Sequence, residues 1–158
     1  MINIINQHTL SELSQVAASS PRLRKNLNLH ASNESRSHRL LNALEPGTYV
    51  QPHCHLNVEK DETMLALSGS FGILIFDADG NVIEQLVMAA GQGNLGVTIP
   101  TGVFHSMVAL EPGSVFFECK AGPYVAVADA EKASWAPAEG DPECAAYLAQ
   151  MLARFTTQ

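Results

Sequence analysis

Turn-forming residues recur through the middle of this chain and divide it into short apolar segments. The clearest pair of segments, Phe71–Phe76 and Val82–Met88, flanks the Asp/Gly/Asn stretch 77–81 and is typical of a β-hairpin. Similar turn signals stand at Pro46-Gly47, Ser68-Gly69, Gly91-Gln92-Gly93, Pro100-Thr101-Gly102 and Pro112-Gly113. Since nothing long enough for a βαβ unit intervenes, the pattern predicts a mainly β, antiparallel sandwich or barrel over residues 31–130.

The region before the barrel, residues 1–30, is predicted to be a helical arm that packs on it. Thr9 and Glu12 have the spacing of a capping box. Leu10, Leu13, Val16 and Ala17 then recur at helical spacing, and Pro21 marks the end of the helix.

The region after the barrel, residues 131–158, is predicted to hold a Trp-Ala-Pro segment and a second helix, all within one structural domain. Asp141 and Pro142 resemble a helix start. An apolar stripe at spacings of three and four follows, and we interpret it as a core-facing surface, with a dimer contact as the alternative. The stripe consists of Tyr147, Leu148, Met151, Leu152 and Phe155.

Composition excludes several classes of protein. The 158 residues are 46% hydrophobic and carry a net charge of −7 without a basic run, which argues against nucleic-acid binding. No signal peptide or membrane-length apolar run is visible, and three cysteines without a close pair argue against a disulfide framework. We therefore expect a cytoplasmic globular protein that does not engage a membrane.

Three histidines carry the chemistry that the sequence predicts. His53 and His55 stand at positions i and i+2, so on an extended strand both side chains project to one face while Cys54 projects away. His105 follows the turn at Pro100 and Gly102, which delivers a third imidazole to a strand. Neutral imidazoles grouped on one face are a common ligand set for a divalent metal ion.

These residues resemble the two motifs of the cupin superfamily. The first motif runs from Gly47 through His53, His55 and Glu62 to Gly69, and the second contains Pro100, Gly102 and His105. The resemblance implies a double-stranded β-helix, or jelly-roll barrel, that holds one divalent ion (Zn, Fe, Mn or Ni) on three histidines and a glutamate. Glu62 keeps the usual spacing to Gly69, whereas Glu59 keeps the usual spacing to His55; we favour Glu62 and treat 56–61 as an insertion.

A narrower resemblance covers nearly the whole chain. Segments 22–30, 47–55, 71–80, 115–124 and 135–140 are similar to the WbuC family of cupin-fold metalloproteins, whose members often accompany O-antigen and other surface-polysaccharide genes. This implies a small-molecule partner, such as a sugar or a carboxylate. Because cupin barrels often pair, a homodimer is one expected assembly.

Further site residues follow from strand parity and from the family motif. Tyr49 and Gln51 share parity with His53, so we expect both near the metal, with Tyr49 able to transfer a proton. Glu118 and Lys120 alternate on a later apolar strand, where they face either solvent or the cavity; the family motif favours the cavity, with Glu118 as a proton-transfer group. Tyr124 could close the mouth of the barrel, and with Gln51 and Lys120 it could bind substrate.

The remaining histidines and the basic residues suggest smaller roles. His30 and Arg39 could reach the mouth of the barrel, while His8 and His38 resemble surface residues. Arg22, Arg24 and Lys25 form a basic cluster, which is either a solvated patch or an anion contact.

Three functions agree with these residues. The first is a metal-dependent enzyme, such as an isomerase or epimerase, that acts on a sugar or nucleotide-sugar. The second is an Fe(II)-dependent dioxygenase. The third is a non-catalytic module that binds or senses a small ligand.

Overall fold

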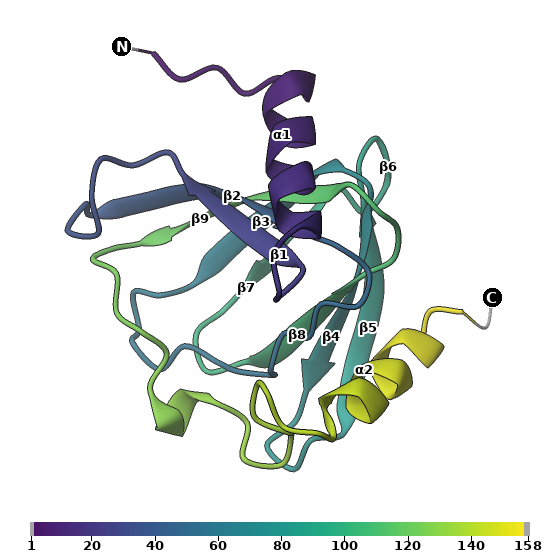
Figure 1. Ribbon diagram of the computed structural model, residues 1–158. Helices are drawn as coiled ribbons and strands as arrows, with labels where there is room; N and C mark the ends of the chain where they lie inside the picture. Colours follow the sequence, from purple (N-terminus) through teal and green to yellow (C-terminus); the bar gives the residue numbers. More distant parts are fainter. Residues whose placement is uncertain (1, 157–158) are drawn as a thin grey trace.

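Two antiparallel sheets enclose the apolar core of the barrel (Figure 1). The structure, a computed structural model, describes residues 2–156. The first sheet has the order β1-β2-β9-β3-β7 and the second has the order β6-β5-β4-β8. The strands are β1 (Arg24–Asn28), β2 (Ser37–Leu44), β3 (Glu62–Ser68), β4 (Ser70–Phe76), β5 (Val82–Ala89), β6 (Gln92–Gly93), β7 (Gly96–Ile99), β8 (Phe104–Ala109) and β9 (Ser114–Ala121).

The apolar alternation of the strands explains how the two sheets face each other. Phe71 and Ile73 on β4 and Met107 on β8 project inward from the second sheet. Met64 on β3 and Phe116 on β9 meet them from the first sheet. The predicted hairpin is confirmed, since β4 pairs with β5 across the turn at 77–81. These core side chains fill part of the barrel interior, and buried polar residues such as Glu62 and His105 occupy another part, the polar end of the barrel.

One helix covers the outer face of the first sheet. In α1 (Gln7–Ala18), Leu10, Leu13 and Ala17 are buried against β2 and β9, but Val16 is 51% exposed. The predicted capping box is wrong, because the helix begins earlier: the side chain of Asn6 accepts the hydrogen bond from the Thr9 backbone N–H.

The second helix covers the outer face of the other sheet, at the lower right of Figure 1. Helix α2 (Cys144–Ala153) buries Leu148 and Met151 against Leu74 and Val108, which confirms the core-facing interpretation of its stripe. It begins at Cys144 rather than at Asp141, whose carboxylate instead accepts from the Glu143 backbone N–H. A 3-10 turn, η1 (Asp129–Glu131), precedes this region. Within residues 2–156 no helix is long and apolar enough to cross a membrane.

The basic cluster near the start of β1 has an internal partner. Arg22 donates from Nε and Nη2 to the two carboxylate oxygens of Glu139, at 2.6 and 2.8 Å. Arg24 donates to the same carboxylate at 2.7 Å. Arg24 also donates to the backbone oxygen of Tyr49 at 2.6 Å. Arg22 and Arg24 thus tie the N-terminal arm to the C-terminal segment, so the anion that they contact is part of the chain.

Replacing Glu139 with glutamine is expected to lower the free energy of unfolding at neutral pH by up to about 1 kcal/mol, because the pair is partly exposed. The hydrogen bond from Arg22 is the main cause of the lowered pKa of Glu139. Its carboxylate therefore stabilises the fold above the unfolded pKa of about 4.3, and this contribution is lost as the pH falls. Urea denaturation of both proteins at neutral pH and near pH 3 measures it; a difference that persists undiminished in acid would contradict the ion-pair explanation.

Candidate metal centre

Two chain segments that lie far apart in the sequence are locked together at the polar end of the barrel. His53 and His105 exchange backbone hydrogen bonds of 3.1 and 2.9 Å, so the segment before β3 runs against the start of β8. Gly102, with a φ of 77°, donates its N–H to the backbone oxygen of His55 at 2.7 Å. The glycine permits the turn that a side chain would strain, and this turn fixes the third histidine beside the first two.

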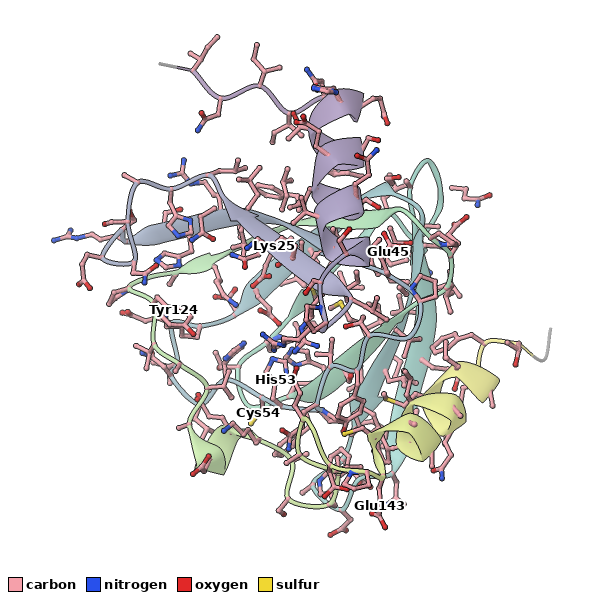
Figure 2. The ribbon with its side chains drawn as sticks, in the orientation of Figure 1. Lys25, Glu45, His53, Cys54, Tyr124 and Glu143 are labelled. Atoms are coloured by element: carbon pink, nitrogen blue, oxygen red, sulfur yellow. The ribbon has the colours of Figure 1, made fainter. Side chains whose placement is uncertain are left out.

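Four side chains converge at this point. One potential ligand atom from each of His53, His55, Glu62 and His105 lies within 4.8 Å of the others. Glu62 Oε1 lies 2.7 Å from His105 Nε2, and Glu62 Oε2 lies 3.5 Å from His55 Nε2. The ring centroids of His53 and His105 are 4.6 Å apart. Figure 2 shows His53 inside the barrel, with Cys54 beside it on the same segment.

Backbone carbonyls orient two of the imidazoles. His53 Nδ1 lies 3.0 Å from the carbonyl oxygen of Gln51, and His105 Nδ1 lies 2.9 Å from that of Val103. A carbonyl can only accept, so each Nδ1 carries the proton and each Nε2 presents its lone pair in the neutral ring. This outer hydrogen bond is the arrangement that fixes the tautomer of metal-binding histidines.

The facing atoms fit a bound cation. His55 Nε2 and His105 Nε2 are buried, and neither makes a hydrogen bond of normal geometry with any residue of 2–156. His105 Nε2 faces a Glu62 oxygen at 2.7 Å, a separation at which a proton or a metal ion must lie between the two electron-pair donors. Nitrogen and carboxylate ligands in this ratio suit Zn, Fe, Mn or Ni.

The surroundings of the site shift the pKa values of two candidate ligands. Burial lowers the pKa of His53 to about 4, so this ring is neutral at pH 7. Burial alone would raise the pKa of Glu62, but the nearby rings of His105 and His55 and the Lys120 ammonium outweigh it and hold the pKa well below its usual range. The site thus presents a neutral imidazole at His53 and an ionised carboxylate at Glu62, which are protonation states that a metal ion requires.

A chain of polar side chains leads from Glu62 across the inner face of the first sheet. Lys120 contacts Glu62 Oε2 at 3.4 Å and also pairs with Glu118. Asn42 on β2 donates to the other oxygen of Glu118 at 2.6 Å. Burial raises the pKa of Glu118, and the two carboxylates raise the pKa of Lys120 against the opposing effect of its burial. Asn42 was not predicted, because its role depends on the β2–β9 register.

The structure separates the two glutamates that the sequence left open. Glu62 is 5% exposed and opens β3 beside the histidines, where it pairs across the sheet with Lys120. Glu59 is exposed in the turn that follows Asn57, whose side chain accepts its backbone N–H. Residues 56–61 therefore form an excursion, and the carboxylate that reaches the histidines is the one at the start of the strand.

The predicted positions of Tyr49 and Gln51 need correction. The Tyr49 ring packs in the cluster beneath α2, and its hydroxyl donates to the backbone oxygen of Pro137 at 2.7 Å. Gln51 makes a side-chain contact of 3.5 Å with the Ala133 carbonyl. Val50 faces the inner core, so strand alternation breaks before His53, at buried Pro52. Tyr49 is thus directed away from the four-residue cluster, while Gln51 serves it through its backbone carbonyl.

Other predicted residues lie beside a neighbouring pocket. Tyr124 is 59% exposed at the left of Figure 2 and, with Lys120 and His30, lines a cavity next to the polar chain. His38 is 4% exposed and lines the same cavity, so the prediction of a surface residue is wrong. Arg39, by contrast, is exposed and does not line this cavity.

Solved structures share this architecture. The protein of unknown function SPY1581 from Streptococcus pyogenes aligns with a TM-score of 0.52 and 14% identity, over 79% of this chain and 91% of its own. KdgF from Halomonas sp. aligns with a TM-score of 0.51 and 17% identity, over 65% of this chain and 82% of its own. Oxalate decarboxylase from Bacillus subtilis aligns with a TM-score of 0.50 and 21% identity, over 65% of this chain and 26% of its own.

At these identities the likenesses define the fold, and they confirm the predicted cupin jelly-roll barrel; the structure confirms its N-terminal and C-terminal helices. The fold is thus a jelly-roll barrel with a His₃Glu cluster that could hold one metal ion. A family model described as a domain of unknown function, DUF6016, matches residues 5–88, more than half of the chain. The chain belongs to this family. No curated protein sequence matches it.

Proposed function

We propose that the chain binds one divalent metal ion through His53, His55, His105 and Glu62. The observation that carries the proposal is the apposition of a buried Glu62 oxygen and the His105 Nε2 at 2.7 Å, inside a group of four ligand atoms. Orientation of His53 and His105 by backbone carbonyls adds support, because the ligands are held in place before an ion arrives.

We propose further that the loaded protein acts on a sugar or nucleotide-sugar in bacterial surface-polysaccharide (O-antigen) biosynthesis. The resemblance of the chain to the WbuC family supports this setting. A bound ion would supply Lewis-acid polarisation of a carbonyl or hydroxyl oxygen. Glu118 would carry the proton, since burial raises its pKa and leaves it suited to general acid–base work. Isomerisation or epimerisation needs these two elements.

Turnover of nucleotide-sugars tests this function. Metal-loaded protein is incubated with a panel of uridine, guanosine and thymidine diphosphate sugars, and the products are followed by proton NMR. Conversion by the wild type, and at least about a hundredfold slower conversion by Glu118→Gln, would support the proposal. Glu84→Gln on the exposed face of β5 is the matched control and should retain wild-type rates.

Experiments on the same purified protein also test the two alternative functions, a dioxygenase and a non-catalytic binding module. Oxygen uptake by anaerobically loaded Fe(II) protein, with no sugar conversion, would favour the dioxygenase. Calorimetric binding of a small ligand without turnover would favour the binding module. Failure of the whole panel to convert or to shift in NMR would reject action on nucleotide-sugars.

A further inference from the structure

A polar pocket adjoins the candidate metal centre on the side of the N-terminal arm. It measures about 280 Å³, just below the roughly 300 Å³ at which sites for drug-sized molecules begin, so it would hold a small ligand. Lys120 lines it and also contacts Glu62, so one side chain separates this pocket from the candidate ligands. The lining residues are Asn26, Asn28, His30, Asn33, His38, Leu40, Lys120 and Tyr124.

His30 presents a ring nitrogen without a partner to this pocket. Its Nδ1 lies 3.0 Å from the backbone oxygen of Arg39 and 3.2 Å from the Arg39 backbone nitrogen, so Nδ1 donates in one tautomer and accepts in the other. The Nε2 accepts or donates accordingly, and a hydroxyl group can bond to it in either state. His30 is 8% exposed, and its Nε2 has no hydrogen-bond partner within residues 2–156. A buried polar nitrogen without a partner is unfavourable, and a ligand hydroxyl would supply the missing hydrogen bond.

The His30 ring is held in place by its neighbours. His30 and His38 stack with ring centroids 3.9 Å apart and an interplanar angle of 21°. His38 Nε2 is anchored on the backbone oxygen of Asn33 at 3.1 Å. Gly122 packs so closely that an added Cβ would lie 1.8 Å from the Ser35 oxygen and 2.6 Å from the His38 ring. A ring stack held on both sides positions His30 Nε2 without a further ordering cost when a ligand binds.

The charge of the pocket indicates what it would bind. Lys120 is the one formally charged group in its lining, and Glu118 and Glu62 already neutralise it. Asn26 donates to the Asn28 side chain at 2.9 Å, which leaves a carbonyl oxygen on one amide and an NH₂ group on the other. Burial also lowers the pKa of His38 and so favours its neutral form. Neutral donors and acceptors match hydroxyl groups better than a phosphate or carboxylate.

We infer that this pocket binds one uncharged, hydroxyl-rich ring, such as a single neutral sugar residue. A sugar hydroxyl would form a hydrogen bond with His30 Nε2, other hydroxyls would meet Asn26 and Asn28, and the exposed Tyr124 ring would cover the apolar face of the sugar. The naming of a sugar rests on the proposed function, but the binding residues are separate from the four candidate metal ligands.

Binding of simple sugars by metal-free protein tests the inference. The probes are methyl glycosides of glucose, galactose and N-acetylglucosamine, with glucuronate and glucose 1-phosphate as charged counterparts. Saturation-transfer NMR and calorimetry should show at least one neutral glycoside with a Kd below about 10 mM. His30→Phe keeps an aromatic ring on His38 but removes the ring nitrogen that would bond to the ligand, and should weaken binding about tenfold. Tyr124→Ala, at an exposed position, should weaken it comparably.

The controls separate this inference from the metal proposal. His8→Phe on the exposed face of α1 should bind like the wild type, as should His53→Ala, which removes a candidate metal ligand. Retained sugar binding in His53→Ala supports the pocket even if no metal or turnover is found. The inference is overturned if no neutral glycoside binds, if only the charged probes bind, or if folded His30→Phe and Tyr124→Ala both retain wild-type affinity.

Discussion

Protein purified with His53→Ala or His105→Ala is expected to contain almost no divalent metal, whereas the wild type should hold close to one equivalent per chain. Each substitution removes one of three imidazoles from a group whose ligand atoms lie within 4.8 Å of one another. Loss of an outer partner alone typically costs 10–100-fold in metal affinity, so loss of a ligand should cost at least about a hundredfold. Elemental analysis of protein prepared without chelators measures the content.

Cys54→Ser is the matched control, because Cys54 lies between two candidate ligands in the sequence. It is 1% exposed, lies outside the ligand group, and its backbone N–H donates to the backbone oxygen of Glu131 at 2.8 Å. Its metal content should equal that of the wild type. Full metal content in folded His53→Ala and His105→Ala would refute the site, and loss of metal in Cys54→Ser would show that the thiol is a ligand.

Phe71→Ala is expected to lower the free energy of unfolding by about 3–5 kcal/mol, the largest effect on stability that we predict. The ring is 0% exposed and meets Phe116 edge-on at 5.3 Å, with an interplanar angle of 87°. This is the contact between the two sheets, so truncation leaves a cavity where the barrel closes. A domain has only about 5–15 kcal/mol of net stability, so the variant should be close to its unfolding threshold.

Urea denaturation of metal-free proteins, followed by circular dichroism, measures this loss without a contribution from metal binding. Ile83→Ala on the paired strand β5 is the control, because Ile83 is 65% exposed. It should change stability by less than about 0.5 kcal/mol. A loss below about 1 kcal/mol in Phe71→Ala would mean that this end of the barrel repacks freely.

The candidate metal ligands lie directly beside the apolar core. Glu62 opens β3, and its neighbours across the sheet are Lys120 on β9 and Ile99 on β7. One inner face thus changes from charged to apolar within a few residues, since Met64 next faces the core. This boundary explains why burial, rather than distant charges, is the first cause of the pKa changes of His53 and Glu118.

Local spacing in the sequence was enough to predict the three histidines of the site. An i, i+2 pair such as His53 and His55 projects to one side of any extended segment, whether or not it pairs as a strand. The turn before His105 is equally local, because Gly102 supplies the backbone conformation by itself. The hairpin at 77–81 and the apolar stripe of α2 were predictable for the same reason.

Only the tertiary structure decided what depends on register and on where alternation breaks. The predicted position of Tyr49 was wrong because the alternation of side chains breaks near Pro52. Side chains before the break therefore lie on the opposite face from the one that parity with His53 predicts. The pairing of Asn42 with Glu118, of Arg22 with Glu139 and of His30 with His38 joins residues whose contact no local pattern encodes. The sequence by itself determined the barrel and its three histidines; packing between distant strands determined the neighbours that hold Glu62 and build the pocket beside it.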